Sequence, residues 1–69
     1  MQVLVFKTNL INTHCIQQVE PYLDHPHINR WNVDLQDCDN ILRIETEALQ
    51  GKEIEKLLLK AGYYCEELE

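Results

Sequence analysis

Apolar residues recur with two different periods along this chain, and the changes of period divide it into six segments. Four segments favour β-strands. The apolar run over 2–7 predicts a buried strand, and the alternation of apolar and polar residues over 28–35 predicts a half-buried antiparallel strand. A third strand is predicted over 41–44, after the polar hairpin loop 36–40. A short last strand is predicted over 63–65, with the glutamates behind it fraying toward the end of the chain.

The two remaining segments have apolar residues at spacings of three and four, the period of an amphipathic helix. The first helix is predicted over 13–24, with Asn12 or Thr13 as its N-cap. Pro21 lies inside it and should kink or loosen its last turn, because proline removes one helical hydrogen bond. The second helix is predicted over 52–61, followed by Gly62 where a left-handed C-terminal cap belongs.

The resulting order, β-α-β-β-α-β, predicts an α+β ferredoxin-like fold in which two helices cover one face of a four-stranded antiparallel sheet. The whole chain, residues 1–69, should form this single domain, because 69 residues leave room for one core only. The connectivity brings loop 9–14, hairpin 36–40 and junction 62–63 to one end of the sheet. A site built from several loops is expected there.

Composition narrows the function classes. A formal net charge of −6 disfavours nucleic acid and anionic membrane surfaces as partners. We expect a cytoplasmic chain, because no run approaches the length of a membrane span and the first residues lack the basic flank of a signal peptide. The three cysteines then read as free thiols. The chain has no serine and only two isolated glycines, and its carboxylates form no acid–base pair, so we do not expect an enzyme.

Several residues resemble the signature of the heavy-metal-associated domain family, which includes small copper chaperones and the N-terminal modules of metal-pumping ATPases. Cys15 matches the second cysteine of the family's metal loop, and Val19 matches the valine four residues beyond it. Segment 31–35 resembles the family's second strand, and Gly62-Tyr63 resembles its closing pair. The resemblance covers nearly the whole chain and is strongest to short, free-standing bacterial members. At the position of the first metal cysteine this chain has Asn12.

The resemblance implies binding or transfer of a soft ion such as Cu(I), which two thiolates hold in the family. The Asn12 amide oxygen is a hard, neutral ligand, so we expect an atypical, weakened site, with Asn12 serving as a helix cap instead. Candidate metal ligands are Cys15 and His14, or Cys15 from two molecules in a homodimer. Expected partners are a basic protein or a metal-transport ATPase domain, since acidic surfaces attract basic ones.

The sequence also leaves alternatives open. The chain is either this degenerate metal domain or a metal-free protein-interaction module that keeps the fold. Tyr63 either shields the metal loop, as the resemblance implies, or only packs. Cys38 either approaches Cys15 or lies apart in an exposed turn, and the Asp24 to His27 turn is either a weak divalent-metal site or only a turn. Trp31 is expected to anchor the core.

Overall fold

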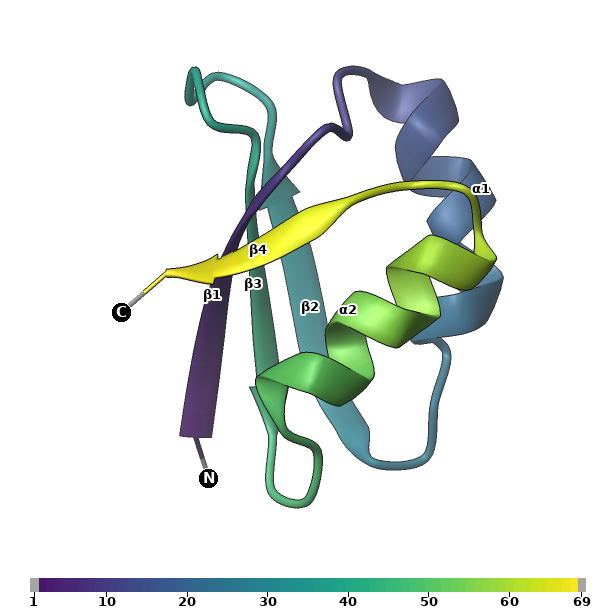
Figure 1. Cartoon of the computed structure of the whole chain (residues 1–69), viewed down its shortest axis with the longest axis vertical. Helices are drawn as coiled ribbons and strands as arrows, with labels where there is room; N and C mark the ends of the chain where they lie inside the picture. The colour runs from purple at the N-terminus through teal and green to yellow at the C-terminus, as the bar shows by residue number, and fades with distance from the viewer. Residues whose placement is uncertain (1, 69) are drawn as a thin grey trace.

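The computed structural model describes residues 2–68 of the chain. Six elements follow one another in the predicted order (Figure 1). They are strand β1 (Gln2–Thr8), helix α1 (Thr13–Leu23), strands β2 (Ile28–Asp34) and β3 (Ile41–Thr46), helix α2 (Gly51–Lys60) and strand β4 (Cys65–Leu68).

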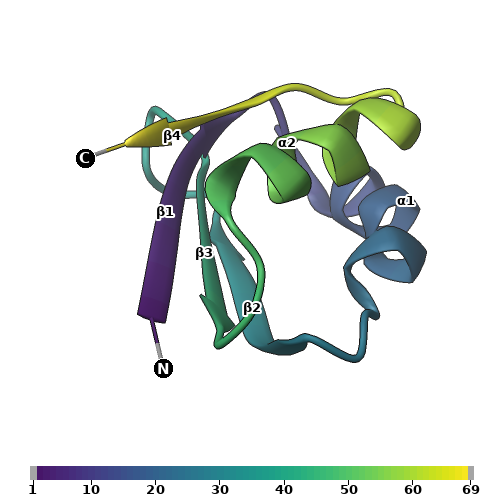
Figure 2. The same ribbon diagram turned by 60° about the horizontal axis from the view of Figure 1, so that its bottom comes forward.

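The four strands form one antiparallel sheet with the order β2-β3-β1-β4. Strands β1 and β3 are therefore central, and β2 and β4 are the edges. Both helices lie on the same face of the sheet, with α1 near β2 and α2 near β4 (Figure 2). The predicted ferredoxin-like architecture is confirmed.

Strands β4 and β1 differ most from the sequence prediction, and β3 continues two residues beyond it, to Thr46. The last strand begins at Cys65 and continues to Leu68, so Glu66 and Glu67 do not fray but pair with Lys7 and Phe6 of β1. Pairing with β1, which is distant in sequence, holds this polar segment in the sheet. The local sequence pattern does not indicate such a pairing. Strand β1 is buried on one side only, because the helices cover a single face of the sheet, and Val3 is 56% exposed on the other face.

Pro21 disturbs α1 less than predicted. The helix continues through Leu23, and the Asp24 backbone N–H still donates to the Glu20 carbonyl at 2.9 Å. Because proline has no N–H, the loss is confined to the hydrogen bond that the Gln17 carbonyl would otherwise accept.

The core lies between the helices and the covered face of the sheet. Trp31 packs against the edge of this core and stays half-buried, so it is a less central anchor than the sequence predicted. Within residues 2–68, no helix has the length and apolar character needed to cross a membrane. The fully buried side chains are Phe6, Leu10, Val19, Leu23, Leu42, Ile44, Thr46, Ile54 and Leu58.

Candidate metal-binding loop

Three connections meet at one end of the sheet, as the connectivity predicts. The Thr8 backbone N–H donates to the Asp39 carbonyl at 3.1 Å, and the Thr8 hydroxyl donates to the Asn40 carbonyl at 2.6 Å. These bonds tie the hairpin to the end of β1. The Tyr64 backbone N–H donates to Asn9 Oδ1 at 2.8 Å, and the Asn9 N–H donates to the Tyr64 carbonyl at 3.3 Å. Hydrogen bonds to the hairpin and to Tyr64 therefore hold the start of the loop that precedes α1.

Asn12 is the N-cap of α1, as predicted. Its backbone is extended, with φ −157° and ψ 176°, and its Oδ1 accepts a hydrogen bond from the Cys15 backbone N–H at 3.0 Å. The amide oxygen thus satisfies one of the free N–H groups of the first helical turn. A side chain engaged in this way is already occupied as a hydrogen-bond acceptor.

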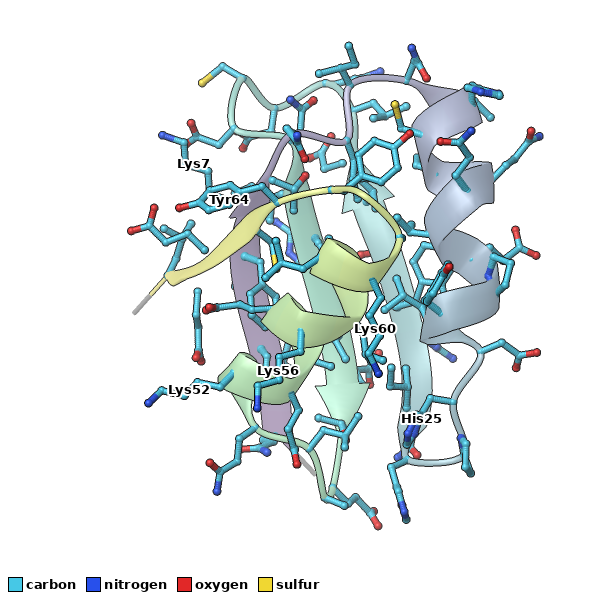
Figure 3. All side chains as sticks on the ribbon, turned by 45° about the vertical axis from the view of Figure 1, so that its right-hand side comes forward. Lys7, His25, Lys52, Lys56, Lys60 and Tyr64 are labelled. Carbon is cyan, nitrogen blue, oxygen red and sulfur yellow. The ribbon has the colours of Figure 1, made fainter. Side chains whose placement is uncertain are left out.

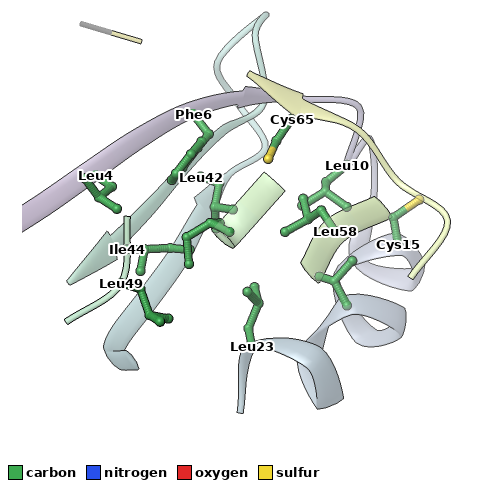
Figure 4. Packing of buried hydrophobic residues seen from close by; sticks show 12 residues of the cluster. Leu4, Phe6, Leu10, Cys15, Leu23, Leu42, Ile44, Leu49, Leu58 and Cys65 are labelled. Carbon is green, nitrogen blue, oxygen red and sulfur yellow. The ribbon is translucent and has the colours of Figure 1, made fainter. Parts of the chain in front are cut away.

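Cys15 lies in the first turn of α1 and is 8% exposed. Interaction with the Tyr63 hydroxyl is the main reason why the pKa of the Cys15 thiol is lowered. Burial opposes this shift, and the backbone N–H groups of Ile11, Asn12 and Cys15 itself add to it. The sulfur therefore faces several donors that favour the thiolate, as sequence position at a helix N-terminus predicts. Its low exposure restricts access, and Figure 4 shows it at the end of the core cluster nearest the α2–β4 connection.

The end of α2 positions Tyr63. The Tyr63 backbone N–H donates to the Leu58 carbonyl at 2.9 Å, and the Gly62 N–H donates to the Leu59 carbonyl at 3.0 Å. With Gly62 at φ +89°, these are the two bonds of a Schellman cap. The predicted role of Gly62 is confirmed. The cap ends the helix and directs the next residue back toward the loop.

The Tyr63 hydroxyl lies between two partners, Cys15 and Gln18. It donates to Gln18 Oε1, and its interaction with the Cys15 sulfur is the main reason why the pKa of Tyr63 is raised. Its ring packs against the core as well. Tyr63 therefore packs and also contacts the loop cysteine, and its role in shielding a metal stays a prediction. Sequence analysis missed Gln18, whose only signal was its position one turn after Cys15.

His14 lies on the exposed side of α1, with its Nε2 3.1 Å from Nε2 of Gln18. Adjacent helical residues leave the helix in different directions, so the His14 ring and the Cys15 thiol do not face each other. His14 as a metal ligand stays a prediction, and it requires the ring to leave Gln18.

Cys38 is exposed in the hairpin between β2 and β3. Within residues 2–68, its sulfur and the carboxylates of Asp37 and Asp39 form the only group of three or more metal-ligating side chains, all within 4.8 Å. Cys15 is not part of this group. The Asp39 N–H donates to Asp37 Oδ1 at 2.9 Å, and Asp39 pairs with Lys7 at 3.8 Å, which is ordinary turn and surface chemistry.

The surroundings of the remaining cysteine, Cys65, and of the histidine turn are those of a core residue and of a turn. Cys65 is buried, and burial, together with the charge of Glu55, raises the pKa of its thiol to about 12. Figure 4 shows its sulfur directed into the core. His25 Nδ1 accepts a hydrogen bond from the His27 N–H at 3.0 Å, which is the geometry of a turn.

No protein-family model matches the chain, and no curated protein matches its sequence. Solved structures do match its fold. The yeast copper transporter domain Ccc2a, described in apo and Cu(I)-loaded states, has a TM-score of 0.83 at 12% identity over 100% of this chain and 97% of that one. The HMA domain of a copper chaperone for superoxide dismutase, in its apo form, has a TM-score of 0.80 at 20% identity over 97% of this chain and 66% of that one. The Atx1–Cu(I)–Ccc2a complex matches with a TM-score of 0.82 at 12% identity over 100% and 97%. The chain therefore shares the fold of these three solved structures.

Proposed function

We propose that this chain binds a soft metal ion such as Cu(I) through the Cys15 thiolate, as a degenerate, non-enzymatic relative of the copper-handling domains whose fold it shares. The observation that carries the proposal is the environment of Cys15. The Tyr63 hydroxyl and the loop N–H groups lower the pKa of its thiol. A thiolate is the form that binds a soft ion, and metal binding competes with a proton for it.

The site should be weak in a single chain. By its resemblance to the family's metal loop, the chain has Asn12 in place of the first metal cysteine, and the Asn12 oxygen is a hard ligand that already accepts a hydrogen bond from the Cys15 N–H. One thiolate leaves a Cu(I) ion short of soft ligands. A second ligand then comes from His14 after a change of rotamer, or from the Cys15 of a second copy.

A metal-handling partner could also supply the missing ligand. One of the matching structures is a complex, Atx1–Cu(I)–Ccc2a, in which two such proteins are joined with Cu(I). A net charge of −6 favours a basic partner, such as a domain of a metal-transport ATPase with a positive surface. Transfer would then pass through a complex in which each protein contributes a ligand.

Cu(I) competition against a chromogenic chelator, with native mass spectrometry of the reduced protein, tests this proposal. The wild-type chain should bind Cu(I) weakly as a monomer or at one ion for two chains. Cys15→Ser should abolish that binding, whereas Cys38→Ser, which removes an exposed thiol outside the loop, should preserve it. Binding that survives in Cys15→Ser would contradict the proposal. A wild-type chain that takes up no Cu(I) would favour the metal-free interaction module instead.

A further inference from the structure

An open groove of about 620 Å³ runs between the C-terminal half of α1 and the edge strand β2. The groove begins at Gln17, two positions after Cys15, and ends at Asp24, nine positions after Cys15 and about 13 Å from it along the helix axis. The groove is open to solvent. Its lining residues are Gln17, Glu20, Pro21, Asp24 and Trp31.

The strand on one side of the groove has an unpaired edge. Within residues 2–68, strand β2 pairs with β3 alone, so the backbone N–H and C=O groups of its other edge have no strand partner. A bulge interrupts the pairing between Ile28 and Arg30, and the register is regular from Arg30 to Asp34. Such an edge can accept another strand. Trp31 lies on this strand with its ring turned to the groove side, half-buried.

The other side of the groove is negative and has no cation of its own. Neither Glu20 nor Asp24 takes part in an ion pair within residues 2–68. Helix α1 contains no lysine or arginine, so it has no basic side chain of its own to offset the partial negative charge of its C-terminal end. The Gln17 carbonyl also lacks its helical donor because Pro21 has no N–H.

The basic residues are concentrated elsewhere. Figure 3 shows Lys52, Lys56 and Lys60 projecting from α2, and Lys7 beside Tyr64. Arg30 belongs to β2 but pairs with Glu45 at 3.8 Å, a residue of β3. The groove therefore combines an aromatic ring with carboxylates and acceptor groups. This combination suits an arginine guanidinium, which donates to carboxylates and stacks on aromatic rings.

From these features we infer that the groove docks an extended, arginine-containing segment of a partner protein. The segment adds to the free edge of β2 as a further strand. One of its guanidinium groups lies over Trp31 and donates to the Glu20 and Asp24 carboxylates. The groups that would hold the segment, Trp31, Glu20 and Asp24, lie outside the loop around Cys15.

The single tryptophan of the chain makes the test direct, because only Trp31 contributes indole fluorescence. The probe is a short peptide that alternates arginine with valine and has blocked ends. It should change the emission of the metal-free protein on titration, and NMR should show the largest amide shifts in β2. The variant E20Q/D24N should weaken binding about fivefold, which corresponds to about 1 kcal/mol for the two exposed charge pairs together. The control E47Q/E66Q removes the same charge away from the groove and should change affinity less than about twofold.

Two further ligands decide between docking modes. A peptide N-methylated on the amides that face β2 keeps its guanidinium groups but cannot form the strand, so it should bind much more weakly. Free arginine amide, which has no strand to add, should also bind much more weakly than the parent peptide. Equal binding of either ligand and the parent peptide would overturn the proposal, because the groove would then only capture cations. No binding of the parent peptide, or equal losses in E20Q/D24N and E47Q/E66Q, would overturn it as well. None of these outcomes depends on Cu(I) binding, and Cys15→Ser should bind the peptide like wild type.

Discussion

The Cys15 thiol and the Tyr63 hydroxyl affect each other's protonation, because the interaction that lowers the pKa of the thiol raises that of the phenol. A phenol that stays neutral adds no negative charge beside the sulfur and so favours the neighbouring thiolate. The Schellman cap at Gly62 holds the tyrosine in place for this contact. At the scale of single residues, the loop is thus arranged around one sulfur atom.

Tyr63→Phe tests this contact. Without the hydroxyl, the pKa of Cys15 should rise toward that of an ordinary thiol, since the largest cause of its lowering is gone. Far-ultraviolet thiolate absorbance in a Cys38→Ser background measures it, because Cys65 titrates only at high pH. Tyr64→Phe is the matched control, as Tyr64 is 56% exposed. The same Cys15 pKa in both variants would show that the hydroxyl has no such role.

The residue types of the loop were predictable, but not all of their contacts. Asn12 as a cap and Gly62 as a left-handed residue follow from local backbone needs, which sequence expresses directly. The Tyr63–Gln18 contact joins residues 45 positions apart, so it depends on how the helices pack. The local sequence pattern therefore does not predict this contact.

Elements were predictable wherever one face is buried, because burial imposes a period on the sequence. Helix α2 shows this clearly, with Ile54 and Leu58 fully buried and the lysines facing solvent. Strand β4 shows the limit of the method. Its Glu66 and Glu67 have no strand-like pattern, and they join the sheet because β1 offers a free edge.

In addition, Gly51 leaves space for the Glu67 carboxylate at the start of α2, where a Cβ would lie 1.9 Å from Glu67 Oε1.

At the scale of the helix, Leu58→Ala and Leu59→Ala form a matched pair. Leu58 is fully buried, so its truncation should lower the free energy of unfolding by about 2–5 kcal/mol. Leu59 is 63% exposed, and its truncation should change that free energy by less than about 0.5 kcal/mol. Urea denaturation measures both. Equal midpoints for the two variants would mean that the buried face of α2 is misassigned.

For the whole molecule, the buried Cys65 couples stability to alkaline pH. Its pKa is raised from 9.0 to about 12, so the folded state keeps a proton that the unfolded state loses. Stability should therefore fall as pH rises from about 9 toward 12. Cys65→Ala should be less stable near neutrality, because it leaves a cavity, but should show a shallower decline over this range. Parallel stability curves for the two proteins would contradict a buried, neutral thiol.

The central claim is that a fold shared with Cu(I)-binding domains has kept one soft ligand, Cys15, and has a capping residue at the other position. Cu(I) affinity of Asn12→Cys compared with wild type tests it most directly. The substitution should raise the affinity by orders of magnitude, because a thiolate replaces a hard oxygen ligand. Its loss of the cap should cost only about 1 kcal/mol of stability. Asn12→Ser, which keeps a capping side chain without a thiol, should bind as weakly as wild type. Equal, tight, one-to-one Cu(I) binding by wild type and Asn12→Cys would contradict the account.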